Sequence, residues 1–322
     1  MKFLKKLLVV LLILIVVNLP AHAGSNPYFK ASDKNFLTVS YIDAGQGDAT
    51  LIECPNGITI LIDGGCGRSR YYPVDAGRKK VLPFLKAKGI KKLNFVIMTH
   101  PDFDHIGGLD SVLREFPVEY LLDSGYPRVI DFYENILKLA DEKNIKYRMI
   151  KAGDELDVND YRITIEILAP DMVRTELDTN DNSIAVKLGF GEVSFLFTGD
   201  AALTEEKYLA DTYGKALRSK IYKVGHHGSE YSTNGFFIKK VAPEAAIISC
   251  GLRNRYGHPS DRVIDLLTDM GVDIYNTSVD GNIMVLTDGI SYKIFTGSSI
   301  FDKNNFNLLA AKDSGKAKTI IP

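Results

Sequence analysis

The sequence is short of cysteine, of net charge and of repeats, and each shortage excludes a class of protein. Among 322 residues there are only three cysteines, and an odd number argues against a disulfide framework. The formal net charge is −1, so no overall field attracts nucleic acid or an anionic membrane. Internal repeats and low-complexity tracts are missing. The remaining composition, 45% hydrophobic and 25% charged, is typical of a globular protein with a sizeable core.

A P-loop is also missing, and histidine is scarce. The glycine-rich segments do not match the P-loop pattern. Of six histidines, one (His22) lies in the N-terminal segment. The other five lie at the ends of expected strands or beside glycine and proline, not on apolar helix faces: His100, His105, His226, His227 and His258. This distribution indicates a functional site rather than core histidines.

The first 23 residues differ from the rest of the chain. A basic start, MKFLKK, precedes eleven apolar residues, and Ala21-His22-Ala23 has the small residues of a signal-peptidase site. The apolar run is shorter than the roughly 20 residues that span a bilayer. We therefore expect residues 1–23 to be a signal peptide and the mature protein to be secreted or otherwise extracytoplasmic, in the periplasm or at the cell surface, without a membrane span. An uncleaved N-terminal anchor is the alternative.

Strands and helices are expected to alternate along the rest of the chain. Runs rich in β-branched residues predict strands within 36–45, 49–65, 92–99, 118–125, 161–170, 183–200, 220–229, 243–251 and 271–297. Helical spacing predicts helices at 76–89, 109–116, 131–144, 203–214 and 260–271. No strong linker divides residues 36–297. We therefore expect one α/β domain there, with two central sheets and helices outside, and a polar tail at 298–322.

The segment MTHPDFDHIGG, residues 98–108, is the densest group of polar side chains that bind metals. It follows an apolar strand, where a loop can aim several side chains at one point, and it carries His100, Asp102, Asp104 and His105. Imidazole combined with carboxylate suits zinc, manganese or iron. A capping turn, with Asp104 at the start of the next helix, is the alternative. The glycine pair 107–108 is expected to let the backbone turn sharply into that helix.

Three later segments carry further candidates. LFTGD places Asp200 at the tip of a buried strand, where it either bridges cations or caps the helix that begins near residue 203. KVGHHGS places His226 and His227 after another strand. The sequence does not decide which of the two binds metal, and we expect His226 because it comes first after the strand. RYGHPS supplies His258, for which a helix-entry turn is the alternative.

Two earlier aspartates also lie at strand ends, Asp48 in GQGD and Asp63 in LIDGG. Asp63 is expected to serve structure by accepting hydrogen bonds from backbone amides or from a ligand histidine. The three cysteines are not expected to bind metal.

In this order, five segments resemble the metallo-β-lactamase-fold hydrolases, and most of all the extracytoplasmic hydrolase domain of the ComEC DNA-uptake competence proteins. They are DAGQGDATLIECPNGITILIDGG, THPDFDHIGGL, FLFTGD, KVGHHGS and RYGHPS. The resemblance covers nearly all of residues 36–297. It implies an α/β fold of four layers, an αββα sandwich, with a metal site at the sheet edges.

The resemblance also implies two divalent metal ions, Zn²⁺ or Mn²⁺. One position would use His100 and Asp102, the other Asp104, His105 and His226, with Asp200 between the two. Asp102 replaces the middle histidine of the wider H-x-H-x-D-H motif, and no histidine lies between His105 and His226. The first position therefore lacks a second imidazole and should favour a harder ion such as Mn²⁺ or Mg²⁺. The nearest polar replacements are Asn180, Asp181 and Asn182.

The function expected from this resemblance is an exported metal-dependent hydrolase, a phosphodiesterase or nuclease that uses a hydroxide held between two cations. Asp104, His227 and His258 are the expected catalytic residues, and the two histidines would protonate the leaving group or contact the substrate. DNA or another phosphodiester is the expected substrate, and Arg253 and Arg255 beside His258 offer a local positive patch. The alternatives are hydrolysis of a small ester, lactone or β-lactam, and a non-catalytic extracellular metal-binding protein.

Overall fold

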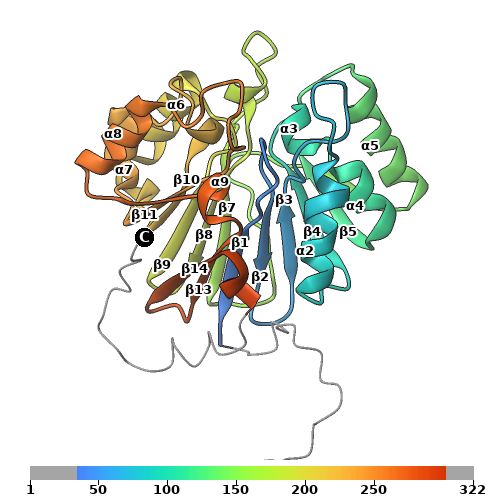
Figure 1. Ribbon diagram of the computed structural model, residues 1–322, viewed down its shortest axis with the longest axis horizontal. Coiled ribbons are helices and arrows are strands. Elements are labelled where there is room, and N and C mark those ends of the chain that lie inside the picture. Colours follow the sequence, from blue (N-terminus) through green and yellow to red (C-terminus); the bar gives the residue numbers. More distant parts are fainter. Residues whose placement is uncertain (1–34, 302–322) are drawn as a thin grey trace, which may run out of the picture.

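The computed structural model describes residues 35–301 and consists of two β-sheets packed face to face, with helices on both outer faces (Figure 1). The expected αββα order of layers is confirmed. The expected signal peptide, residues 1–23, and residues 302–322 of the expected tail lie outside the described residues. Within residues 35–301, no helix is both long and apolar enough to cross a membrane.

One sheet has eight strands in the order β14-β13-β1-β2-β3-β4-β5-β6. Strands β3 to β6 run parallel, whereas β1, β2, β13 and β14 pair antiparallel with their neighbours. The bounds are β1 Leu37–Tyr41, β2 Thr50–Glu53, β3 Thr59–Ile62, β4 Leu93–Met98, β5 Val118–Asp123, β6 Lys146–Met149, β13 Ile283–Thr287 and β14 Tyr292–Thr296.

The other sheet has six strands in the order β12-β11-β10-β9-β8-β7. Strands β9 to β12 run parallel, and β8 is antiparallel to both β7 and β9. The bounds are β7 Ile163–Ala169, β8 Ala185–Phe190, β9 Val193–Phe197, β10 Ile221–Lys223, β11 Ala245–Ile248 and β12 Asp273–Asn276.

The helices form two groups, one on each outer face (Figure 1). Those on the eight-stranded sheet are η1 Gly77–Val81, α2 Leu82–Ala87, α3 Phe103–Ile106, α4 Leu109–Glu115 and α5 Asp131–Glu142. Those on the six-stranded sheet are α6 Leu203–Tyr213, η3 Gly214–Leu217, α7 Gly235–Val241 and α8 Asp261–Asp269. Short turns of helix complete the chain: η2 Asn180–Asn182, η4 Gly225–Gly228, α9 Thr277–Asp280 and η5 Gly297–Phe301.

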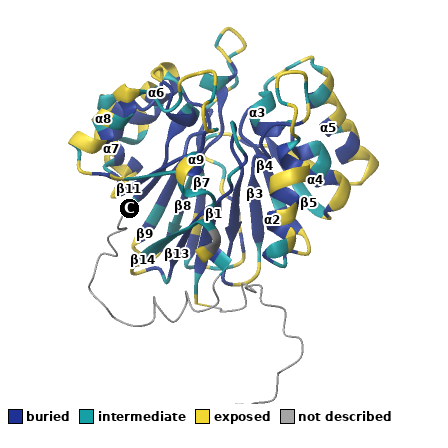
Figure 2. Cartoon of the chain, viewed as in Figure 1, coloured by how far each residue is buried: buried dark blue, intermediate teal, exposed yellow. Residues whose placement is uncertain are grey.

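The central strands are apolar on both faces because both faces are covered. In β3, Ile60 and Ile62 point into the core between the sheets, whereas Leu61 points toward the helices. Figure 2 shows the result: the central strands are buried and the exposed residues lie mainly on the outer helices and loops. This arrangement explains why the sequence shows continuous apolar runs here rather than alternation.

Several elements were not expected from the sequence. They include strand β6, helices α3, α7 and α9, and the division of the helix expected at 76–89 into η1 and α2. Residues 298–301, which the sequence assigned to the tail, belong to η5, and Ile300 there is fully buried in the core under the helices. All three cysteines are buried and free.

The expected role of the glycine pair 107–108 was wrong. Both residues have ordinary right-handed helical backbone, with φ of −57° at Gly107 and −79° at Gly108. A Cβ on Gly108 would lie 2.2 Å from the carbonyl oxygen of Gly64, and a Cβ on Gly107 would lie 2.5 Å from the amide nitrogen of Gly67. The pair is therefore needed for close backbone packing beside α3 and not for a sharp turn.

The parallel strands bring the candidate residues to one edge of the sandwich. Strand β4 ends two residues before His100, β9 ends three residues before Asp200, and β10 leads into η4 with its two histidines. In open parallel sheets, the carboxyl ends of the strands form the usual ligand-binding edge. The fold thus assembles at this edge residues that are far apart in the sequence.

Candidate metal centre

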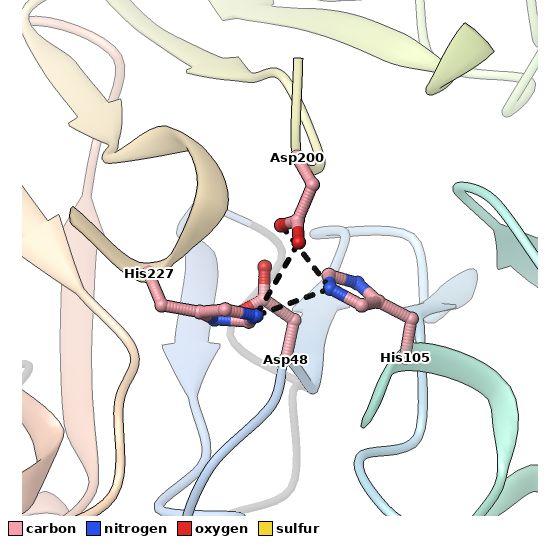
Figure 3. A group of neighbouring side chains, drawn as sticks. All are labelled: Asp48, His105, Asp200 and His227. Atoms are coloured by element: carbon pink, nitrogen blue, oxygen red, sulfur yellow. Dashed lines mark hydrogen bonds and ion pairs between the residues drawn. The ribbon is translucent and has the colours of Figure 1, made fainter. Parts of the chain in front are cut away.

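Residues from both sheets meet at this edge. His105 on α3 belongs to the eight-stranded sheet's side, and Asp200 and His227 follow strands of the six-stranded sheet. Figure 3 shows that the side chains of Asp48, His105, Asp200 and His227 point toward one another. These four buried residues each offer one ligand atom within 4.8 Å of the others.

Two of the histidines have Nδ1 fixed by an acceptor behind the ring. His105 Nδ1 donates to Asp63 Oδ2 at 2.8 Å, and His227 Nδ1 donates to the carbonyl oxygen of Ser249 at 2.9 Å. A carboxylate and a carbonyl can only accept, so the proton of each neutral imidazole lies on Nδ1. The Nε2 lone pairs are therefore free to bind a cation. The expected supporting role of Asp63 is confirmed.

His100 is oriented in the same way by Thr99. Thr99 Oγ1 donates to Asp63 Oδ2 at 2.7 Å, so its oxygen accepts from His100 Nδ1 at 3.1 Å. His100 is fully buried, and its Nε2 has no hydrogen-bond partner among the described residues. A buried nitrogen without a partner costs stability, and a cation bound there would compensate this cost.

The distances around His227 fit a metal ion. Its Nε2 lies 3.3 Å from His105 Nε2, 3.4 Å from Asp104 Oδ2 and 3.5 Å from Asp200 Oδ2, and Asp200 Oδ1 lies 3.1 Å from His105 Nε2. Ligands bound tetrahedrally with bonds of about 2.1 Å are about 3.4 Å apart. His105, Asp200 and His227 therefore form a donor set of the correct size and chemistry for a divalent cation, and Asp104 lies beside it, next to His227.

A second, wider group surrounds the free nitrogen of His100. Its Nε2 lies 3.9 Å from Asp102 Oδ2 and 3.9 Å from Asp200 Oδ2. Asp102 Oδ1 accepts from Arg128 Nη1 at 2.8 Å and from Thr179 Oγ1 at 2.9 Å, which leaves Oδ2 toward His100. The carboxylate of Asp200 thus lies between the two donor groups.

The structure separates the two adjacent histidines that the sequence left undecided. Both adopt left-handed backbone, with φ of 49° at His226 and 56° at His227, and their rings lie at 76° to each other. His227 is buried among three donors, whereas His226 Nε2 is 3.7 Å from Asp200 Oδ2 and its side chain is 21% exposed. The geometry thus places His227 in the donor set and His226 beside it.

Helix capping does not explain these acidic residues. Helix α6 has Ala202 as its N-cap, and Asp181 Oδ1 accepts from the amides of Ala202 and Glu205, so Asp181 and not Asp200 caps this helix. The N-cap of α3 is Asp102, which makes no side-chain capping hydrogen bond, and Asp104 faces His227 instead.

The three polar residues proposed as replacements for a missing histidine have different roles. Asp181 is occupied as a helix cap, and the amide of Asn182 bonds to the backbone of Arg174 and Asp178. Asn180 Oδ1 is buried and has no hydrogen-bond partner within residues 35–301.

Sequence reasoning missed a buried ion pair behind the site. Lys223 Nζ lies 2.6 Å from Asp48 Oδ2, and Asp48 Oδ1 lies 3.1 Å from His227 Nδ1. Burial raises the pKa of Asp48, but Lys223 and His227 lower it more, so its pKa is below the ordinary value. The available signal was Lys223 itself, a cation inside the buried strand β10 that requires a buried partner.

The acid–base balance of the site follows from the same neighbours. Burial raises the pKa of Asp200, but His105, His227 and His226 lower it far below its usual range. Burial lowers the pKa of His105, but Asp200 and Asp63 raise it well above the ordinary value. Burial together with the charges of His227 and His226 lowers the pKa of His258 to about 4. The ring centroid of His258 lies 5.7 Å from that of His226, at the margin of the donor set.

The comparisons with known proteins agree with this geometry. Residues 42–252 match the family model of the metallo-beta-lactamase superfamily. The chain belongs to this superfamily. The solved structure of CmlA, a diiron β-hydroxylase from Streptomyces venezuelae, superposes with a TM-score of 0.50 at 14% identity, over 81% of this chain and 54% of that one, which shows a shared fold.

Three relatives confirm the expected resemblance to competence proteins. ComE operon protein 3 of Bacillus subtilis is 33% identical over 76% of this chain and 32% of its own length. Recombination protein 2 of Haemophilus influenzae is 33% identical over 80% and 30%, and competence protein ComA of Neisseria gonorrhoeae is 30% identical over 78% and 32%. The chain spans about a third of the length of these relatives. Fold, family and donor set together support a metal-dependent hydrolase of the metallo-β-lactamase superfamily.

Proposed function

We propose that this chain is an exported phosphodiesterase that cleaves DNA or another phosphodiester with two divalent cations, Zn²⁺ or Mn²⁺. The observation that carries the proposal is the convergence of His100, His105 and His227 on Asp200, each histidine with Nδ1 held from behind and Nε2 free. The similarity to competence and recombination proteins supports nucleic acid as the substrate. The basic and apolar character of residues 1–23 supports export.

The ligand distances support one assignment of the cations. Asp104, His105 and His227 would hold one cation, His100 and Asp102 would hold the other, and Asp200 lies between the two groups. This exchanges the roles that the sequence suggested for His226 and His227, because only His227 Nε2 lies within 3.5 Å of three other donors. His226 and His258 then face the substrate.

When bound, divalent cations supply Lewis acidity here: they lower the pKa of water and neutralise charge that develops on phosphoryl oxygens. The residues of the chain determine where this happens. Asp63 and Ser249 fix the tautomers of His105 and His227, and the pair of Asp48 and Lys223 holds His227 from behind. The half-buried ring of His258 is positioned to contact the substrate beside these ligands.

The test is an activity panel on the purified protein saturated with Mn²⁺ or Zn²⁺, with single-stranded DNA, bis-p-nitrophenyl phosphate and nitrocefin as substrates. We expect cleavage of both diesters but not of nitrocefin, and loss of cleavage in EDTA and in Asp200→Asn. His226→Ala and His227→Ala form a matched pair for elemental analysis, in which only His227→Ala should lose bound metal.

Three results would contradict the proposal. Cleavage of nitrocefin alone would indicate a small-substrate hydrolase. Tightly bound metal without any cleavage would indicate a non-catalytic metal-binding protein. Metal lost from His226→Ala but retained by His227→Ala would restore the ligand suggested by the sequence.

A further inference from the structure

Two loops beside the metal centre carry the same R-x-R-Y pattern, at residues 68–71 and 253–256. Both loops are anchored to Gln46, two residues before Asp48. Cys66 Sγ donates to the carbonyl oxygen of Gln46 at 2.9 Å, and the amide of Gly251 donates to Gln46 Oε1 at 3.1 Å. The two loops therefore flank the same edge of the site.

Arg255 joins the loops through three tyrosines. Its Cζ lies 5.3 Å from the ring centroid of Tyr71, 5.7 Å from that of Tyr72 and 4.8 Å from that of Tyr256. The hydroxyl oxygens of Tyr72 and Tyr256 lie 2.8 Å apart. Tyr71 is nonetheless 69% exposed and Tyr256 46% exposed, so aromatic surface held in place by these contacts faces solvent. We call these four residues the tyrosine–arginine platform.

The platform is continuous with the metal centre through stacked rings. Tyr256 lies 5.5 Å from His258 between ring centroids, at an interplanar angle of 23°. His258 lies 6.1 Å from the ligand candidate His227, at 28°. The ring of His258 thus connects the ligand candidate His227 to Tyr256 of the platform. With a phosphodiester at the cations, a neighbouring nucleobase would reach the platform.

The same loops carry a local group of positive charges, although the net charge of the chain is close to zero. Arg68, Arg70, Arg253 and Arg255 are exposed, and in the part of the chain that the structure describes none of them lies within 4.0 Å of a carboxylate. The formal net charge of the chain is only −1, so binding of a polyanion has to come from such a local group. Aromatic faces combined with arginines that are not neutralised by carboxylates are the surface that binds single-stranded nucleic acid in many proteins.

We propose that the tyrosine–arginine platform stacks against unpaired nucleobases next to the cleaved phosphodiester and so selects single-stranded over double-stranded nucleic acid. This inference rests on the proposed phosphodiesterase function. A double helix hides the faces of its bases, whereas every unpaired base offers a face to a tyrosine ring or a guanidinium plane. Selection would therefore depend on strandedness and only weakly on base sequence.

The test compares kcat/KM for three substrates: a single-stranded DNA oligonucleotide, the same strand with abasic residues around the cleaved linkage, and its duplex. The abasic strand keeps the phosphates and removes the stacking partners. We expect the base-bearing strand to be preferred over both by about tenfold or more. Tyr71→Leu and Tyr256→Leu should reduce this preference toward unity, whereas Tyr256→Phe keeps the ring and should keep the preference.

The matched control is Tyr161→Leu, which should leave the preference and the activity unchanged. Tyr161 is 97% exposed and lies just before β7. The first residue of β7 is level with the start of β9, whereas the metal centre follows the end of β9, so Tyr161 lies at the opposite end of the sheet. A plot of log(kcat/KM) against the logarithm of the salt concentration should have a negative slope, and Arg255→Ala should make this slope less steep by about one. Thermal unfolding of each variant shows whether it is folded.

The outcomes separate this inference from the proposed function. If the wild-type protein cleaves base-bearing, abasic and duplex DNA equally well, the proposed role of the platform is wrong and the phosphodiesterase activity is supported. This result needs no folded variant. If it cleaves no diester at all, the proposed function fails and the inference with it. A preference that survives both leucine substitutions would also overturn the platform.

Discussion

Replacing Asp63 by asparagine should weaken metal binding without disturbing the fold. The carboxylate of Asp63 is fully buried and accepts three hydrogen bonds, from Thr99 N at 2.9 Å, Thr99 Oγ1 at 2.7 Å and His105 Nδ1 at 2.8 Å. Its backbone has φ of 58°, in the left-handed region that asparagine tolerates well. The substituted asparagine therefore has the size of the native aspartate and can adopt its backbone conformation.

The amide cannot accept all three hydrogen bonds. If the amide nitrogen takes the place of Oδ2, its N–H group faces the N–H of His105. If it takes the place of Oδ1, it faces the backbone N–H of Thr99. In either case two hydrogen-bond donors point at each other. The first conflict is relieved when the proton of His105 moves from Nδ1 to Nε2. That tautomer places an N–H where the lone pair toward the cation should be.

Loss of such a supporting hydrogen bond weakens metal affinity by about 10- to 100-fold, or about 1.4 to 2.7 kcal/mol. Isothermal titration of the metal-free protein with Zn²⁺, in competition with a chelator, measures this change. Asp110→Asn, at a half-exposed position on α4 paired with Arg114, is the control and should bind as the wild type does. An affinity of Asp63→Asn within twofold of the wild type would refute the reasoning about the tautomer.

The pH dependence of stability and the N-terminal segment each give one further test. Burial raises the pKa of the Glu206 carboxyl group from 4.5 to about 7. Between these two pH values the folded protein keeps a proton that the unfolded chain loses. The free energy of unfolding should therefore fall by about 3 kcal/mol as pH rises from about 4.5 to 7. Urea unfolding at pH 5 and pH 8 should show a smaller decrease for Glu206→Gln, and equal decreases would contradict this. N-terminal sequencing of protein recovered from its host should find Gly24 first, whereas Met1 would contradict cleavage.

The sequence predicted the elements that carry strong apolar patterns and missed those that depend on neighbours. Strands β4 and β9 are apolar runs followed by polar loops, and both were located correctly. Strand β6, Lys146–Met149, has four exposed residues, two of them cationic, and it forms because it pairs in parallel with β5. Such a strand has no periodicity of its own to detect.

The same limit applies to the site. The motifs identified the loops that deliver His100, His105 and Asp200, because ligand-type residues cluster there after apolar strands. They did not decide between His226 and His227, which are adjacent and have similar backbone angles. That choice depends on the carbonyl of Ser249 and on the Asp48–Lys223 pair, contacts between segments that no local pattern connects.

The metal centre is therefore a property of how the two sheets pack, and not of either sheet alone. His105 lies on α3 beside the eight-stranded sheet, and His227 lies in η4 after strand β10 of the six-stranded sheet. Their Nε2 atoms are 3.3 Å apart. A backbone hydrogen bond joins the two sides at the site: Ile184 N donates to Thr99 O at 2.8 Å and connects the loop after β4 to the start of β8. Because close-packed interiors transmit changes in volume, the core between the sheets fixes the separation of the ligands. Segments about a hundred residues apart in the sequence thus act as one site only in the assembled sandwich.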